Sequence, residues 1–331
     1  MRYTVSWNKY WKYLAKISIS ASALMLISVS HADDFPNRAI MYVVPYATGS
    51  TADNLGRVIA KGMEHELGKP VVVENRSGAG ALIGANYVAR SKPDGYTILF
   101  GAGSTHTTPQ AITANMPYDP LKDFAPIAMI GSTSYVLYAN PNLPFKNLKD
   151  LIKYAKLHPG KVSFGSSGTG TASHLAMEHL EKVAGIRLLH IPYRGGGQIL
   201  VDLMGGQIDL GVSTAESAHL AKSGKIQPIA ILGTKRLSAL SNVQTCYEQG
   251  VADCGFPVWN ALFAPSGTPK STMDKLTAAA NAAIESPAIQ KRLREFGYEP
   301  SGPISAEEIQ RRIKKEINFV NTLAKEAGIV P

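Results

Sequence analysis

Four short runs rich in glycine, serine and threonine carry the side chains best suited to bind a small molecule. They span residues 47–53, 101–107, 165–173 and 212–217, and each follows an apolar run and precedes a helix-like pattern. Glycine lets the backbone approach a ligand closely, while Ser and Thr hydroxyls supply neutral hydrogen bonds. A helix N-terminus adds unpaired N–H groups and a partial positive charge. Together these features favour a carboxylate or a phosphate as the ligand.

The same residue types also cap helices and form turns, so a single run of this kind does not establish a site. Four runs at equivalent positions favour a shared site, because ligands of open α/β sheets bind beyond the carboxyl ends of the strands. Within these runs His106 is the better candidate for touching a ligand. We expect His174 beside the third run, as a supporting or capping residue. Asp53 either orients the first run, as an acid in the first helical turn commonly does, or meets an ammonium group.

A fifth stretch joins a tyrosine and an arginine to three glycines. Tyr193 and Arg194 directly precede residues 195–197, which are all glycine. Arg194 either binds an anion through two parallel hydrogen bonds or remains solvated, and the sequence leaves both interpretations open.

Motifs of several enzyme and cofactor classes are absent or incomplete. Gly78, Gly80 and Gly84 resemble a dinucleotide fingerprint, but the next apolar run ends in "TILFGAG" without the acid that would hold a ribose. No phosphate-binding loop of nucleotide hydrolases and no Gly-x-Ser-x-Gly nucleophile elbow occurs. His174 and His179 lie about 140° apart around a helix, which excludes a shared metal of the i, i+4 type. We therefore expect no cofactor, no metal and no catalysis.

The elements that position these runs alternate between strands and helices, which predicts an α/β fold. The apolar run over 127–140 reads as continuous strand material, and Gly68 and Gly160 are typical helix stops. Expected strands cover 39–46, 70–75, 95–103, 127–140, 161–166, 186–192, 207–213, 225–233 and 258–265. Helices are expected after the glycine-rich runs, over 148–160 and over two C-terminal segments, one of them 306–328.

The N-terminus has the order of a secretory signal peptide. Four cations without an acid precede an apolar run of about 14 residues, and small residues flank a cut after Ala32. The run is shorter than the roughly 20 residues that span a bilayer. Removing residues 1–32 lowers the formal charge from +9 to +5. No basic stretch interleaved with aromatics occurs, so nucleic acid is not an expected partner.

Cys246 and Cys254 are the only cysteines, eight positions apart in a loop-like stretch. In an oxidising compartment they can form a disulfide, with two free thiols as the alternative. Their spacing fits neither a redox Cys-x-x-Cys nor a zinc knuckle.

The whole chain after residue 32 resembles one known family. The segments that carry the resemblance are "PYATGSTAD", "ENRSGAGALIGANYVARSKPDGYTIL", "MPYDPLKDFAPI", "LHPGKVSFGSSGTGTASHLA", "HIPYRGGGQILVDLMGGQIDL" and "LFAPSGTP". They are similar to the Bug (Bordetella uptake gene) family, the extracytoplasmic solute-binding proteins of tripartite tricarboxylate transporters. The resemblance implies a type II, Venus-flytrap fold of two lobes, with residues 33–133 plus 257–331 in one lobe and 134–256 in the other.

In this family the first loop and the Ser/Gly-rich loop of the other lobe grip a ligand carboxylate, partly through waters. By position, residues 48–51 match the first loop and residues 166–170 the second. The complete set of expected ligand-binding residues is Tyr46, Thr48, Gly49, Ser50, Thr51, Asp53, Ser104, His106, Ser166, Ser167, Gly168, Thr169, Gly170, His174, Tyr193, Gly195, Ser213 and Thr214.

Two positions depart from the family pattern. Ser50 stands where the first loop usually carries the second glycine of a pair, so an additional side chain enters the site. Ser213 stands where many relatives carry Asp, and a neutral residue there fits a second carboxylate or an aromatic ring better than an ammonium group.

The expected function is capture of a small organic carboxylate, a dicarboxylate or an aromatic carboxylate, in the periplasm, with delivery to membrane transporter subunits. Closure of the two lobes around the anion is the expected mechanism. Presentation of the ligand to a membrane sensor kinase would use the same site and stays open as an alternative. An enzyme acting on a carboxylated substrate would need a nucleophile, base or metal constellation, and no convincing one occurs.

Overall fold

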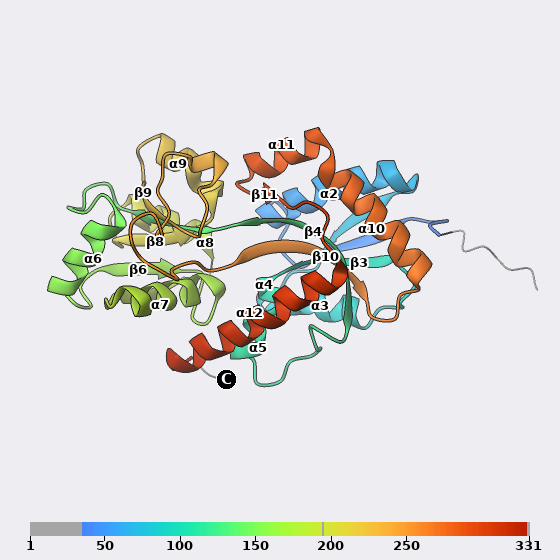
Figure 1. The fold of residues 1–331 in the computed structure, drawn as a ribbon, viewed down its shortest axis with the longest axis horizontal. Coiled ribbons are helices and arrows are strands. Elements are labelled where there is room, and N and C mark those ends of the chain that lie inside the picture. Colours follow the sequence, from blue (N-terminus) through green and yellow to red (C-terminus); the bar gives the residue numbers. More distant parts are fainter. Residues whose placement is uncertain (1–34, 194, 330–331) are drawn as a thin grey trace, which may run out of the picture. The chain divides into compact units, whose positions relative to one another are not determined.

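The computed structural model describes residues 35–193 and 195–329. The expected signal peptide and Arg194 lie outside these residues. No helix of the described segments is long and apolar enough to cross a membrane. The described chain forms two sheets with helices packed on them (Figure 1).

The first sheet has six strands in the order β11-β4-β10-β3-β1-β2. The strands are β1 (Ile40–Val44), β2 (Val71–Asn75), β3 (Thr97–Ala102), β4 (Phe124–Thr133), β10 (Val258–Pro265) and β11 (Glu299–Pro300). β1 pairs in parallel with β2 and β3, whereas β10 runs antiparallel to β3 and β4. The loops after β1, β2 and β3 therefore leave the same edge of the sheet.

Helices surround this first sheet. They are α2 (Thr51–Leu67), η1 (Ala79–Ala81), α3 (Leu82–Ala89), α4 (Gly103–His106), α5 (Thr108–Ile112), α10 (Lys270–Glu285) and α11 (Pro287–Glu295). The local sequence explains the limits of α2: the Ser50 hydroxyl accepts the Asp53 N–H, and Gly68 takes a left-handed φ of 64° at the other end. Between these ends Leu55, Ile59 and Met63 bury one helical face completely.

The second sheet has five strands in the order β7-β6-β8-β5-β9. They are β5 (Tyr135–Ala139), β6 (Ser163–Ser166), β7 (Leu189–Pro192), β8 (Leu210–Ser213) and β9 (Gln227–Leu232). Its helices are α6 (Leu148–Leu157), α7 (Ala172–Ala184), α8 (Gly196–Met204), η2 (Ala215–Ser217), α9 (Ala218–Lys222) and η3 (Ser238–Leu240). β6 is parallel to both β7 and β8, so the third and fourth Gly/Ser/Thr runs also follow neighbouring parallel strands.

The expected continuous strand over 127–140 is wrong. β4 ends at Thr133 in the first sheet, and β5 begins at Tyr135 in the second. The apolar pattern continues across this point because both strands are buried, while their pairing partners differ: β10 for β4, and β8 with β9 for β5. The lobe boundaries at 133/134 and 256/257 stay a prediction.

The last helix, α12 (Ala306–Glu326), contributes to two hydrophobic cores. Ile309, Ile313 and Ile317 pack in the core of the first sheet, with Phe124 and Phe263 among its members. Val320, Leu323 and Ala324 pack in the core of the second sheet. Along its length α12 contacts α5, β4 and α7 (Figure 1).

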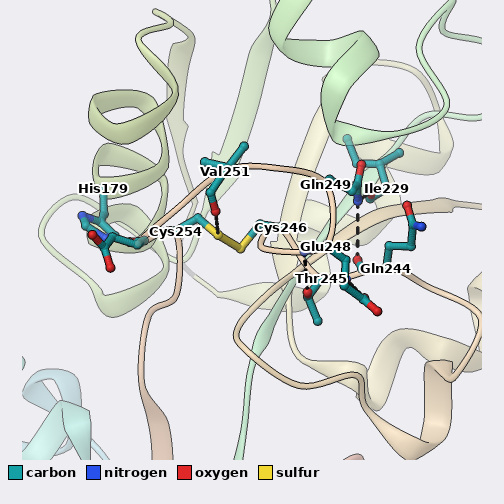
Figure 2. The surroundings of a disulfide bond; sticks show 10 residues. His179, Ile229, Gln244, Thr245, Cys246, Glu248, Gln249, Val251 and Cys254 are labelled. Carbon is teal, nitrogen blue, oxygen red and sulfur yellow. Dashed lines mark hydrogen bonds between the residues drawn. A yellow bond between two sulfur atoms is a disulfide. The ribbon is translucent and has the colours of Figure 1, made fainter.

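A disulfide joins Cys246 and Cys254 in the segment between η3 and β10 (Figure 2). Both cysteines are fully buried in the core of the second sheet. Beside the disulfide, the Gln249 side chain donates to the Ile229 carbonyl of β9 at 2.9 Å and accepts the Leu148 N–H at 2.7 Å. These bonds attach the cysteine turn to α6 and β9.

Candidate functional site

The first Gly/Ser/Thr run lies between β1 and α2 and is organised by a residue outside it. Asn75, at the end of β2, donates to the Tyr46 carbonyl at 3.0 Å and to Asp53 Oδ1 at 3.0 Å. It also accepts the Thr48 hydroxyl at 3.2 Å. The Tyr46 hydroxyl lies 2.5 Å from Ser104 Oγ, which links the residue just before the first run to the second run.

Asp53 orients this run from within. Its side chain is 2% exposed, accepts the Gly49 N–H at 2.9 Å and pairs with Arg57 at 3.0 Å. Burial works to raise the pKa of Asp53, but the hydrogen bonds from Gly49, Arg57 and Asn75 and the Arg57 charge lower it below its ordinary value. Because its oxygens are occupied by these donors, the orienting role fits Asp53 and the ammonium-binding role does not.

The third run uses most of its hydroxyls to hold its own shape. Ser167 N–H donates to Ser173 Oγ at 3.0 Å, and the two hydroxyls lie 3.1 Å apart. Thr171 Oγ1 donates to the Gly168 carbonyl at 2.7 Å. Gly168 and Gly170 have φ angles of 131° and 77°, which only glycine adopts readily. Thr169 is exposed at the tip of the run.

His174 supports this loop as expected, from the first turn of α7. Its Nδ1 accepts the Gly170 N–H at 3.0 Å, and its Nε2 lies 3.2 Å from Glu178. The ring is buried beneath the loop.

The fourth run meets the first. Thr51, the first residue of α2, hydrogen-bonds through its hydroxyl to Glu216 Oε2 of η2. Ser213 lies 3.0 Å from Ser217 Oγ, and the Thr214 carbonyl accepts the Tyr138 hydroxyl at 3.2 Å. The bond between Thr51 and Glu216 therefore joins the start of α2, beside the first sheet, to the fourth run.

A buried tyrosine completes the surroundings of Glu216. Burial raises the pKa of Tyr298, and the charges of Glu216 and Tyr46 add to that effect. Tyr298 lies just before β11.

The glycines after Tyr193 border a hollow of about 460 Å³, lined by Pro192, Tyr193, Gly195, Gly197 and Gln198. The Tyr193 hydroxyl donates to Asp202 at 2.8 Å, and burial together with this bond raises the pKa of Tyr193 to about 12. Gly195 has a φ of 155° and open space where a side chain would be. Tyr193 and Gly195 therefore border the start of α8.

The expectation that His106 touches a ligand is wrong for this structure. Its ring is fully buried, with its centroid 3.9 Å from that of Phe263 and 4.9 Å from that of Phe124. Burial lowers the pKa of His106 to about 3, so the ring stays neutral. The Ser/Thr-rich sequence around His106 suggested an exposed loop, whereas α4 turns the ring into the aromatic core.

A larger cavity of about 660 Å³ lies along α3 and includes none of the predicted ligand residues. Its lining contains the cations Arg38, Arg76, Arg90 and Lys92. Arg38 pairs with Asp94 at 3.3 Å and Arg76 with Glu74 at 2.6 Å. Since two of the four cations already have acidic partners, we assign no ligand to this cavity.

The predicted loops offer main-chain N–H groups to an anion. By the geometry of an α-helix, the first N–H groups of α2 and α7 have no acceptor within the helix, and they carry the positive end of its dipole. Within residues 35–193 and 195–329 no cluster of His, Cys, Asp or Glu could hold a metal ion. The arrangement suits hydrogen bonding to a carboxylate.

Four residues of this region escaped sequence reasoning: Asn75, Ser173, His190 and Glu216. Asn75 ends a strand beside β1, so the rule that places ligand loops at strand ends could have found it. Glu216 lies inside a predicted run but was not singled out. His190 stands five positions before the glycine run, and no local pattern marks it.

Comparison with known proteins identifies the family. A model described as tripartite tricarboxylate transporter family receptor, TctC, matches residues 55–329. The protein BugT of Bordetella pertussis is 33% identical over 96% of this chain and 98% of its own length. The chain belongs to the TctC family. Its fold is that of the two-lobed periplasmic binding proteins, and the family is one of solute-binding receptors and not of enzymes.

Two solved structures of similar proteins contain dicarboxylates. Rpa4515 of R. palustris, solved with adipate, is 35% identical with a TM-score of 0.81, over 90% of this chain and 100% of that one. MatC of Rhodopseudomonas palustris, with bound malate, is 29% identical with a TM-score of 0.76, over 87% of this chain and 99% of that one. TctC proteins thus bind small carboxylates and serve tripartite transporters.

Proposed function

We propose that the protein captures a small dicarboxylate and delivers it to the membrane subunits of a tripartite tricarboxylate transporter. One carboxylate is bound by N–H groups at the starts of α2 and α7, with Thr48, Ser50 and Thr51 on one side and Ser167, Gly168 and Thr169 on the other. The observation that supports this most directly is the placement of both glycine-rich runs after parallel strands and before long helices. Adipate and malate in two similar proteins support the choice of a dicarboxylate.

Ser213 and the second carboxylate are the finer part of the proposal. Ser213 ends β8 in the region of Ser217, and it brings no charge to the site. A neutral residue there tolerates a second carboxylate better than the Asp of many relatives would, because two like charges in one site repel. An aromatic carboxylate is the other ligand that a neutral position tolerates.

Calorimetric titration of the chain without residues 1–32 tests the ligand class. Adipate and malate should bind and raise the melting temperature, benzoate tests the aromatic option, and neutral sugars should do neither. Binding of sugars alone would disprove the anion site.

Ser167→Asp tests the second loop. A carboxylate next to the ligand carboxylate should weaken adipate binding on the order of 100-fold, because two like charges about 4 Å apart repel strongly in partly buried surroundings. Ser241→Asp, an exposed position outside the four runs, is the matched control and should bind as wild type. Equal affinity of Ser167→Asp and wild type would remove this loop from the site.

Two alternative functions were an enzyme and a receptor that presents its ligand to a sensor kinase. Membership of a solute-binding family argues against the enzyme. No observation favours presentation to a sensor kinase, so the transporter is the partner we propose.

A further inference from the structure

Two histidines lie stacked beneath the third Gly/Ser/Thr run. The ring centroids of His174 (α7) and His190 (β7) are 3.7 Å apart, with 15° between the ring planes. Phe164 of β6 lies beside the pair, with its centroid 4.9 Å from that of His190 and 6.3 Å from that of His174. Both imidazoles are therefore fixed in position by aromatic contacts within the second sheet.

His174 holds the end of the loop in a defined tautomer. Its Nδ1 accepts the Gly170 N–H at 3.0 Å, so the ring proton of the neutral form lies on Nε2. The Nε2 atom that carries this proton lies 3.2 Å from Glu178 Oε1. A second proton on Nδ1 would leave the Gly170 N–H without an acceptor in buried surroundings.

His190 holds the start of the loop. Its Nε2 lies 2.7 Å from Ser166 Oγ, which in turn accepts the Gly168 N–H at 3.2 Å. The two stacked rings thus contact both ends of residues 166–170.

The surroundings of the pair disfavour a state in which both rings are protonated. Burial, followed by the nearby His174, lowers the pKa of His190 to about 4, against an opposing effect of Glu178. On α7, Glu181 accepts the Leu188 N–H at 2.5 Å, and burial raises its pKa to about 7 while Arg187 works to lower it. Glu178 is thus the acid in direct contact with the stack.

We propose that His174 and His190 are positioning residues of the carboxylate-binding loop and that they hold Ser166–Gly170 in its binding shape only while both rings are neutral. The inference rests on the proposed function, because it assigns the loop to the ligand site. Adipate affinity should accordingly fall on acidification, because a proton added to His174 Nδ1 would leave the Gly170 N–H without an acceptor.

Two substitutions of His174 separate positioning from general stability. Asn places an oxygen near the position of Nδ1 and does not titrate, so His174→Asn should keep the affinity at pH 8 within about threefold. Its affinity should also vary less with pH than that of wild type. His174→Leu removes the acceptor and should weaken adipate about tenfold at pH 8. His65→Asn, at an exposed histidine of α2, is the control and should follow the wild-type pH profile.

Calorimetry with adipate at several pH values measures these affinities, and His174→Asn corrects for protonation of adipate itself. A wild-type profile that matches His174→Asn, or rises on acidification, would overturn the neutral-ring proposal. Wild-type affinity in His174→Leu would overturn the positioning role.

Amide hydrogen exchange of the ligand-free protein keeps this test separate from the proposed function. Peptides covering 163–175 should exchange faster in His174→Leu than in wild type, with His174→Asn close to wild type. Unchanged exchange in His174→Leu would contradict positioning whether or not adipate binds. Failure of wild type to bind any carboxylate would instead contradict the proposed function.

Discussion

At the scale of single residues, the loops are built by polar groups that bind one another. Asp53 and Asn75 illustrate this, because together they receive or supply the hydrogen bonds of Gly49, Tyr46 and Thr48. The carboxylate of Asp53 faces only donors, so its charge is an integral part of the loop. Removing that charge should therefore destabilise the folded loop.

Asp53→Asn should lower the free energy of unfolding by about 1–3 kcal/mol at pH 7, because the amide nitrogen would face donors such as Gly49 N–H. The folded-state pKa of Asp53 is lowered below 3.8, so this contribution is present above pH 4 and lost as the pH falls through the folded-state pKa. Urea unfolding should therefore show a gap between variant and wild type at pH 7 that shrinks by pH 3.

Asp94→Asn is the matched control for this measurement. Asp94 also pairs with an arginine, but the two side chains are 40% and 60% exposed, so the loss should stay below about 1 kcal/mol. An equal loss in both variants would contradict the special role of Asp53.

The sequence alone predicted which residue types would form the loops, and it misjudged the direction of one side chain, that of His106. Ser50, Ser167 and Ser213 were expected to face a ligand, yet each also bonds to a neighbour in its own loop. His106 lies in the core because its ring packs on Phe263, which is 157 positions away in the sequence and invisible to local patterns. Composition predicts the chemistry of a loop, whereas the direction of a side chain depends on distant packing.

At the scale of elements, α12 is fixed to the first sheet by a buried carboxylate. Glu316 lies 2.7 Å from the Trp259 Nε1 of β10 and 2.7 Å from the Thr107 hydroxyl between α4 and α5. Burial raises the pKa of Glu316 to about 7, although both hydrogen bonds work to lower it. The protonated acid fits this position, because Trp259 can donate to one oxygen while the other donates to Thr107.

Glu316→Gln should therefore stabilise the protein at alkaline pH. A raised folded-state pKa favours the protonated form, so wild-type stability falls as the pH rises from 4.5 through about 7. The amide mimics the protonated acid and does not titrate, which predicts a gain of about 2–3 kcal/mol at pH 8.5 and none at pH 4. Urea unfolding at both values measures it.

Trp259 offers a direct readout of the same group. It is the only tryptophan outside residues 1–32, so fluorescence of the chain without that segment reports on its indole alone. Wild type should show a titration near pH 7 that Glu316→Gln lacks, with exposed Glu295→Gln as the control. A titration that persists in Glu316→Gln would assign it to another group.

Helix limits were predictable and the change of sheet was not. Helical spacing and Gly68 predicted where α2 ends, since both signals act within a few residues. The passage from β4 to β5 at Ser134 has no such signal, because the strands differ only in partners far along the chain. Local chemistry sets the ends of a helix, whereas sheet membership depends on the assembled fold.

At the scale of the whole described chain, α12 joins the two cores. Ile313 is buried with the first sheet and Leu323 with the second, less than three helical turns later. A substitution that destabilises either core should therefore also destabilise α12, which packs in both cores. We expect a single cooperative unfolding transition.

Ile313→Ala and Leu323→Ala should each cost about 2–4 kcal/mol, because each leaves a cavity in a close-packed core. Both should shift the Trp259 fluorescence transition in urea, although Leu323 packs with the second sheet and Trp259 belongs to the first. Exposed Lys314→Ala is the control. The cores would unfold independently if Leu323→Ala left the urea midpoint of the Trp259 fluorescence unchanged while circular dichroism showed two steps.

The hydrogen bonds between Ser167, Thr171 and Ser173 have a kinetic consequence. A loop already ordered before it meets its ligand loses little conformational entropy on binding. Association should then be limited by diffusion and orientation, with rate constants on the order of 10⁶ M⁻¹s⁻¹ or above. Differences in affinity among dicarboxylates would lie mainly in how long each one stays bound.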